Sequence, residues 1–264
     1  MTEQHQEYDD NLTAVLEAVW GEGFMSPGGV AEVDNYLQGI NLEGLSVLDI
    51  GCGLGGVDLH LLKQHKAARV TGIDIDASLI ERCNDLAKRH QIQAQTEFIC
   101  VEPGPLAFAD ASFDIVTSKD SIIHIADKHA LAADIFRVLK PGGWFVASDW
   151  MAGYDGEPSA DMQAYLTAEG LDFGLASLDG YEDALSKAGF TEIALVDRNH
   201  WYRQQARTER EQLKTEIYDN LRAKIDTDFL ASQIEVWDKM IIVLDQGELR
   251  PGHLRGRKPD TISV

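Results

Sequence analysis

The chain has 264 residues, of which 44% are apolar, which suffices for one large folded domain and excludes a disordered or fibrous protein. Lysine and arginine number 23 against 44 aspartates and glutamates, and the net charge of −21 argues against nucleic acid as a partner. The apolar runs are too short to span a membrane, no signal peptide is visible, and three scattered cysteines form no disulfide or zinc pattern, so we expect a cytoplasmic protein without a membrane partner.

The first half of the chain alternates between helical and strand-like segments. Apolar spacing predicts a helix over residues 8–20, a loop over 24–29 and a second helix to about residue 37. Predicted strands then cover 46–50, 69–75, 96–101, 113–117 and 144–149, with helices reaching about residue 65 and covering 79–90 and 128–139. This alternation is typical of βαβ units and a parallel sheet.

After residue 149 the rhythm changes. Residues 151–171 are polar, 181–188 predict a helix, 193–196 a strand, 201–245 a long charged helical region and 248–258 a terminal strand. We therefore divide the chain into an N-terminal helical cap over 1–40, a core over 41–150, and residues 151–264, which carry a lid and the last strands.

The first predicted strand ends in four glycines, within Val47-Leu48-Asp49-Ile50-Gly51-Cys52-Gly53-Leu54-Gly55-Gly56. Such a loop lets the backbone approach a ligand closely, and the helix that follows favours anionic or polar groups at its N-terminus. Asp74 closes the second strand, 23 residues beyond Gly51, where a carboxylate can accept both hydroxyls of a ribose. The two features indicate an adenosine-bearing cofactor and leave its identity open.

Two further segments indicate which adenosine-bearing cofactor is bound. With Phe113-Asp114-Ile115-Val116 and the turn Leu139-Lys140-Pro141-Gly142-Gly143-Trp144, the core over residues 40–150 resembles class I S-adenosylmethionine-dependent methyltransferases. The resemblance implies an α/β fold, a Rossmann-like doubly wound seven-stranded sheet with an antiparallel last strand, and S-adenosylmethionine across the carboxyl ends of the first two strands.

Segments outside the core narrow the resemblance. Tyr8, residues 20–29 and the loop Ser118-Lys119-Asp120-Ser121-Ile122-Ile123-His124 are similar to phosphoethanolamine N-methyltransferases. The tail over 249–259 is similar to the ends of both these enzymes and sarcosine/dimethylglycine N-methyltransferases.

The resemblance implies a set of cofactor-binding residues: Met25, Ser26, Gly51, Gly53, Asp74, Ile75, Glu102 and Lys119. In that set Asp74 takes the ribose hydroxyls and Ile75 the adenine face, while Glu102, which Pro103 follows, is an imperfect match to the acid that reads the adenine amine.

The same resemblance implies three catalytic residues. Tyr8 and His124 match the pair that gates the site and assists deprotonation of the amine, and Asp120 matches the carboxylate partner of that amine. Without the surrounding motif, His124 beside Ile122 and Ile123 is better read as a core histidine.

Departures from the family pattern concern the substrate. Positions that clamp a phosphate in the phosphoethanolamine enzymes are Leu171, Phe173 and Met240 here, and a tyrosine after the fifth strand is Trp150. A buried phosphate without cationic or hydroxyl partners is strongly unfavourable, whereas aromatic residues suit a methylated amine.

We therefore predict N-methylation of a glycine-derived amine, sarcosine or dimethylglycine, in the direction of betaine. The expected substrate-binding residues are Trp150, Phe173, Trp201 and Tyr202, and Arg203, Arg250 or Arg255 are candidate anchors for a carboxylate.

Three alternatives stay open: a phosphoethanolamine N-methyltransferase, a nicotinamide-dependent oxidoreductase, and a non-catalytic cofactor-binding protein. The glycine spacing and the Lys140–Gly143 turn oppose the second, and the retained Tyr8, Asp120 and His124 oppose the third. We expect a small amine as partner and a monomer or a weak homo-oligomer.

Overall fold

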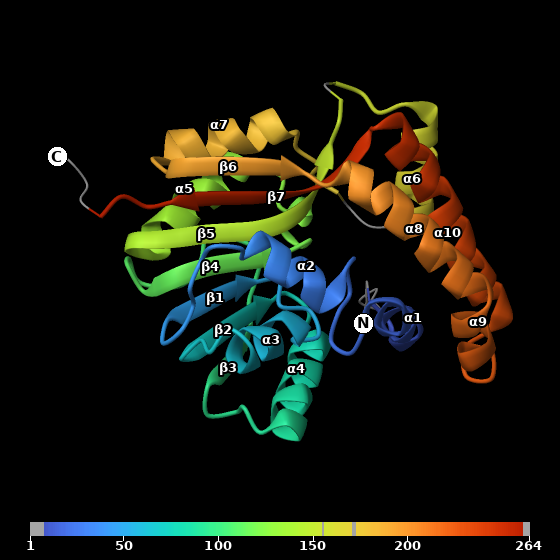
Figure 1. The fold of residues 1–264 in the computed structure, drawn as a ribbon, viewed down its shortest axis with the longest axis horizontal. Coiled ribbons are helices and arrows are strands. Elements are labelled where there is room, and N and C mark those ends of the chain that lie inside the picture. The colour runs from blue at the N-terminus through green and yellow to red at the C-terminus, as the bar shows by residue number, and fades with distance from the viewer. Residues whose placement is uncertain (1–7, 155, 171–172, 261–264) are drawn as a thin grey trace.

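A seven-stranded mixed sheet forms the centre of the computed structural model, which describes residues 8–154, 156–170 and 173–260 (Figure 1). Its strands are β1 (Ser46–Ile50), β2 (Arg69–Asp74), β3 (Thr96–Cys100), β4 (Phe113–Lys119), β5 (Leu139–Ala152), β6 (Thr191–Asp197) and β7 (Leu249–Arg257). They lie in the order β3-β2-β1-β4-β5-β7-β6, and β7 runs antiparallel to both of its neighbours. The predicted fold class is confirmed.

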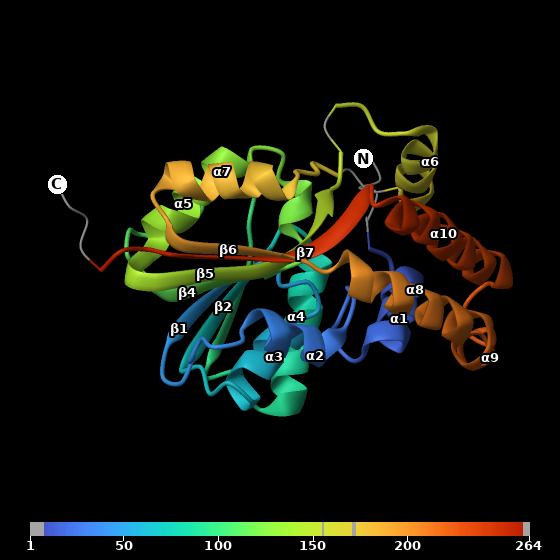
Figure 2. The same cartoon turned by 45° about the horizontal axis from the view of Figure 1, so that its top comes forward.

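Helices cover both faces of this sheet. They are α1 (Asp10–Trp20), α2 (Gly29–Tyr36), α3 (Gly56–Lys63), α4 (Ala77–His90), the 3-10 turn η1 (Ile122–His124), α5 (Lys128–Val138), α6 (Ala160–Glu169), α7 (Leu178–Ala188), α8 (Asn199–Lys214), α9 (Glu216–Leu221) and α10 (Thr227–Gln246). Helices α5 and α7 lie on one face and α2, α3 and α4 on the other (Figure 2). The carboxyl ends of the parallel strands face α1, α6, α8 and α10 (Figure 1).

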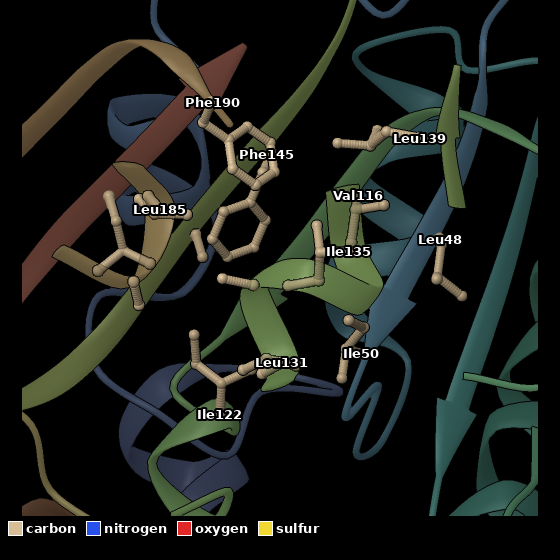
Figure 3. Close-up of a cluster of buried hydrophobic side chains, with 14 of the residues drawn as sticks. Leu48, Ile50, Val116, Ile122, Leu131, Ile135, Leu139, Phe145, Leu185 and Phe190 are labelled. Carbon is tan, nitrogen blue, oxygen red and sulfur yellow. The ribbon is translucent and has the colours of Figure 1, made fainter. Parts of the chain in front are cut away.

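Alternate residues along the central strands enter opposite layers of the core. Leu48 of β1 faces the layer beneath α5 and α7, where it packs with Val116, Ile135 and Phe145 (Figure 3). Its neighbour Val47 faces the other layer, beneath α2 and α3. Because both faces of the sheet are buried, these strands carry buried residues on both faces and not in strict alternation.

The chain departs from the sequence expectation in two places. The single helical region expected over 201–245 is broken into α8, α9 and α10, and Asp226 begins the last of these by accepting hydrogen bonds from the backbone of residues 228 and 229. The expected turn over 140–143 lies inside β5, where it forms an irregularity in the strand pairing. Phe113 of β4 pairs with Leu139, but Ile115, two residues later, pairs with Trp144, five residues later. No helix of the described ranges is long and apolar enough to cross a membrane.

One buried carboxylate joins the N-terminal cap to the lid and the last strand. Glu32 of α2 accepts two hydrogen bonds of 2.8 Å from Arg198, just before α8, and one of 2.6 Å from His253 of β7. Burial alone would raise the pKa of Glu32, but the hydrogen bonds from His253, Arg198 and Asn35 outweigh it and lower that pKa to about 2. The cap is thus fastened by residues far along the chain.

Candidate active site

The glycine loop after β1 is packed too closely to tolerate side chains. Gly51 and Gly53 have φ angles of +74° and +54°, in the region that favours glycine. A Cβ atom on Gly51 would lie 2.3 Å from the Cβ of Ser121, and one on Gly53 would lie 3.1 Å from the sulfur of Met25. The loop therefore lies between the segment after β4 and the cap, which brings two predicted cofactor-binding segments together.

Asp74, at the end of β2, braces this loop from the side. Its Oδ2 accepts a hydrogen bond of 3.0 Å from the backbone of Gly53, and its Oδ1 accepts one of 3.0 Å from the backbone of Asp76. Burial raises the pKa of Asp74, and these hydrogen bonds oppose the rise. Ile75 beside it is 58% exposed, and Glu102 is exposed just beyond the neighbouring β3. A carboxylate next to an exposed apolar side chain fits a ribose and the face of its base.

Lys119 fastens the cap loop to the end of β4. Its ammonium donates hydrogen bonds of 2.7 Å to Ser26 Oγ, 2.8 Å to the Pro27 carbonyl and 2.9 Å to Asp120 Oδ2. The side chains of Lys119 and Asp120 are only 3% and 6% exposed. Asp120 has a φ of +56°, a left-handed conformation that aspartate tolerates better than most residues. The predicted Ser26, Lys119 and Asp120 thus form one buried polar group.

His124 closes the short turn η1 that follows Asp120. The centroid of its ring lies 5.5 Å from that of Phe173, and the backbone of Gly174 donates a hydrogen bond of 2.8 Å to the Ile123 carbonyl. The turn itself is held from below, because the Ile123 backbone donates to Asp149. A predicted catalytic residue and a predicted substrate-binding residue therefore lie in contact, with their rings tilted by 50°.

An aromatic cluster gathers the remaining predicted residues beyond η1. Tyr8, Trp150, Phe173 and Trp201 pack against one buried apolar group that includes Tyr202 and Met240. The ring of Trp150 lies 5.1 Å from that of Tyr202, and the ring of Trp201 lies 5.6 Å from it. Tyr202 is fully buried, so it backs Trp150 and Trp201 and does not form the exposed wall that the sequence suggested.

Glu209 is a functional candidate that the sequence analysis missed. It is fully buried and accepts hydrogen bonds from the Nε1 of Trp20 at 2.9 Å, the hydroxyl of Tyr202 at 3.0 Å and the Nε1 of Trp237 at 3.3 Å. It thereby fixes three aromatic rings from the cap and the lid. The sequence did contain a clue, because Glu209 falls at helical spacing on the same face of α8 as the buried Tyr202, Ala206 and Leu213.

A second carboxyl group, Glu169, was also overlooked. It ends α6, one turn after the buried Tyr165. Burial raises the pKa of Tyr165, and the charges of Glu169 and Tyr8 raise it further. Burial raises the pKa of Glu169 itself to about 7. The Tyr8 side of the aromatic cluster therefore carries an acid.

The arginines expected as carboxylate anchors do not converge on this cluster. Arg203 pairs with Asp245 at 2.8 Å, Arg250 pairs with Asp197, and Arg255 lies over the ring of Trp144 near the start of β5. Leu171, expected to replace a phosphate ligand, lies outside the described residues, while Met240 is buried on α10.

Comparisons with known proteins identify the domain that contains the glycine loop. A family model described as a methyltransferase domain matches residues 48–147, from β1 into β5. Phosphoethanolamine N-methyltransferase 1 of Arabidopsis thaliana is 33% identical over 201 residues, which are 76% of this chain and 40% of that protein. The chain belongs to the class I S-adenosylmethionine-dependent methyltransferases. Because that class uses S-adenosylmethionine, the predicted cofactor is confirmed at the level of the family, and the nicotinamide alternative is set aside.

Another relative matches nearly the whole of this chain. The phosphoethanolamine N-methyltransferase of Plasmodium falciparum is 24% identical over 259 residues, 97% of this chain and 94% of that protein. The methyltransferase spans only 35% to 40% of the length of the plant relatives it matches.

Two solved structures share the fold of the methyltransferase. Phosphoethanolamine N-methyltransferase 2 of Haemonchus contortus, in complex with phosphomonomethylethanolamine and S-adenosylhomocysteine, has a TM-score of 0.85 at 24% identity and covers 98% of this chain and 59% of its own. A Galdieria sulphuraria protein assigned as a sarcosine dimethylglycine methyltransferase has a TM-score of 0.78 at 20% identity and covers 96% of this chain and 100% of its own. At these identities both show the fold alone.

A buried pair of acids lies under the glycine loop of the methyltransferase. Both carboxyl oxygens of Asp49 and of Asp58 are buried, and none has a donor among the described residues. Burial and the neighbouring charge of Asp58 raise the pKa of Asp49, and burial raises the pKa of Asp58 to about 7. Both carboxyl groups therefore favour the protonated form, Asp49 more strongly than Asp58.

This pair should make the stability of the methyltransferase fall with rising pH. The native state keeps a proton that the unfolded chain releases near its ordinary pKa of 3.8, so the stabilisation is present below that pH and is lost as the pH rises through about 7. Asp58→Asn replaces this titrating acid with an amide donor. We expect urea unfolding between about pH 5 and pH 8 to show a shallower pH dependence in the variant. Equal slopes in the two proteins would refute the raised pKa of Asp58 in the folded state.

Proposed function

We propose that the methyltransferase transfers a methyl group from S-adenosylmethionine to the nitrogen of a small aliphatic amine. The observation that carries this proposal is the short chain path from Lys119 to His124. It contacts the glycine loop through Ser121, whose hydroxyl donates to the Gly51 carbonyl at 3.0 Å, and it faces Phe173 of the aromatic cluster through His124. The six residues from Lys119 to His124 thus connect the glycine loop to the aromatic cluster.

We assign the cofactor to the residues around the glycine loop. Asp74 accepts the ribose hydroxyls, Ile75 covers the adenine, Glu102 lies within reach of its amine, and Met25 and Ser26 line the methionine part. Bound S-adenosylmethionine supplies an electrophilic methyl group on a sulfonium centre. Lys119 holds Ser26 and Asp120 in fixed positions through its three hydrogen bonds, which limits the rearrangement needed during turnover.

The residues at the acceptor side handle the proton of the amine. An ammonium has no lone pair, so the amine must lose a proton before its nitrogen can attack. Asp120 Oδ1 holds the N–H group, and the ring of His124 accepts the proton, with the Tyr8 hydroxyl as gate. A positioned base of this kind contributes roughly 10²–10⁴-fold to the rate. The aromatic rings exclude water and hold the nitrogen in line with the methyl group.

The comparisons favour phosphoethanolamine as the acceptor over the glycine series that the sequence analysis preferred. Relatives named for phosphoethanolamine include one that matches this chain over nearly its whole length. The likeness to the Galdieria protein rests on fold at 20% identity. Phosphoethanolamine is therefore the first candidate, and sarcosine or dimethylglycine the second.

The second candidate is retained because of the acids and apolar side chains on the acceptor side. Glu169 adds a negative charge near the buried Tyr165 when ionised, and Phe173 and Met240 offer no donor to a phosphate. A phosphate dianion is disfavoured by such surroundings, whereas a methylated ammonium gains from aromatic faces.

An assay of acceptors should separate the two candidates. At one fixed cofactor concentration, methyl transfer is measured with phosphoethanolamine, ethanolamine, glycine, sarcosine and dimethylglycine, and the products are weighed by mass spectrometry. If phosphoethanolamine is the acceptor, transfer to it should exceed transfer to ethanolamine by about 10³-fold, since a site that binds a charged group rejects an analogue that lacks it.

Glu169→Gln is the matched variant for this assay. Removal of its negative charge should raise transfer to phosphoethanolamine and leave transfer to ethanolamine nearly unchanged. Robust transfer to sarcosine or dimethylglycine with none to phosphoethanolamine would establish the second candidate, and no transfer to any amine would refute the proposed N-methylation.

A further inference from the structure

Two histidines and an aspartate converge on the outer side of the cap, away from the glycine loop. Asp34 belongs to α2, His60 to α3, and His65 to the segment directly after α3. The Nε2 atoms of His60 and His65 lie 2.7 Å and 2.8 Å from the same atom, Asp34 Oδ1. The three atoms all lie within 4.8 Å of one another. Helices α2 and α3 lie side by side on the same face of the sheet (Figure 2).

The chemistry of these three side chains matches that of a transition-metal site. Two imidazole nitrogens and one carboxylate oxygen are the ligands that Zn²⁺ takes in sites with three protein ligands and one open position. Their spacing is compatible with such an ion, because tetrahedral zinc separates its ligand atoms by about 3.3 Å. The two nitrogen–oxygen distances need to open by only about half an ångström, and the two nitrogens, which lie within 4.8 Å of each other, need to settle at the same separation.

The surroundings of the three side chains favour a bound cation. His60 is only 9% exposed in its side chain, so its ring is fixed by packing, whereas the carboxylate of Asp34 is 55% exposed and open to solvent. The net charge of −21 raises the local concentration of cations around the protein.

We propose that Asp34, His60 and His65 form a binding site for a divalent transition-metal ion, with zinc as its probe. The ion replaces the two N–H hydrogens that now bridge the imidazoles to the carboxylate. It would join α2, which directly follows Met25, Ser26 and Pro27, to α3, which directly follows the glycine loop. A metal at this position clamps the cap to the core from the outer side. The site does not depend on the acceptor or on the proposed reaction.

The test uses the full-length chain without a histidine tag, freed of metal by a chelator and titrated with zinc chloride in a calorimeter. We expect the wild type to bind one zinc that His60→Gln and His65→Gln bind at least about tenfold more weakly, since loss of even an outer-shell partner costs roughly 10–100-fold. His129→Gln is the matched control, because His129 is exposed and lies 3.4 Å from a single carboxylate, that of Asp183.

Two further readouts guard against misfolded variants and adventitious zinc. Zinc should raise the melting temperature of the wild type and of His129→Gln but not of His60→Gln or His65→Gln, each compared with its own metal-free form. Cobalt should give the absorption bands of a four-coordinate ion in the first two proteins alone. Equal zinc affinity, equal thermal shifts or equal cobalt spectra in all four proteins would overturn the proposal.

Discussion

Replacement of His124 by alanine is expected to lower the turnover number by about 10²-fold or more while the affinity for S-adenosylmethionine barely changes. His124 lies on η1 with its ring against Phe173, on the acceptor side of the segment that contacts the glycine loop. Loss of the imidazole therefore removes an acceptor for the amine proton and leaves the residues assigned to the cofactor in place. Steady-state kinetics at saturating substrates and calorimetry with the cofactor measure the two effects separately.

His129→Ala serves as the control for this prediction, because His129 is an exposed histidine on α5 outside the candidate site. Tyr8→Phe should also slow turnover, since it removes only the hydroxyl assigned to the gate. Wild-type rates in both His124→Ala and Tyr8→Phe would show that the two residues are structural and that their assignment by resemblance is wrong.

Asp74→Ala should weaken the binding of S-adenosylmethionine by at least tenfold. The carboxylate is assigned two charge-assisted hydrogen bonds to the ribose, each worth roughly 1.5–3 kcal/mol. The structure adds a second contribution, because Asp74 also accepts the backbone hydrogen bonds of Gly53 and Asp76 that shape the loop. Calorimetric titration of folded variant protein measures the combined loss.

Two variants separate the contributions to cofactor binding. Asp74→Asn keeps one acceptor oxygen and should lie between the wild type and Asp74→Ala, whereas Asp85→Ala changes an exposed acid on α4 and should bind as the wild type does. If folded Asp74→Ala bound S-adenosylmethionine as tightly as the wild type, Asp74 would not be the residue that binds the ribose.

The sheet was predictable from the sequence because its determinants are local. The strands, the helices between them and the glycine loop can each be predicted from short segments such as 46–56. The antiparallel direction of the last strand was expected only from the family resemblance. The broken helix over 199–246 was missed, since the whole stretch reads as one charged helical pattern. Its breaks depend on capping by Asp226 and on packing against α1 and α6.

The acidic residues of the lid were not predictable in the same way. Glu209 stands in a sequence of charged residues that looks solvated, and it is buried only because Trp20 from the cap and Trp237 from α10 direct their indole N–H groups to it. A period of 3.6 residues assigns a residue to a helix face, but it does not state which distant side chains meet that face.

The position of β7 has a consequence for how the chain folds during its synthesis. Residues 249–257 are made after every other strand, yet they lie between β5 and β6, and β6 pairs with no strand except β7 in the described sheet. Until they leave the ribosome, the edge of β5 is open and β6 is unpaired, which are features that favour misassembly in a nascent chain. The N-terminal cap also docks late, because Glu32 binds His253, which lies 221 residues further along the chain. Contacts between residues so far apart in sequence form slowly. The N-terminal helices are thus made first and docked last.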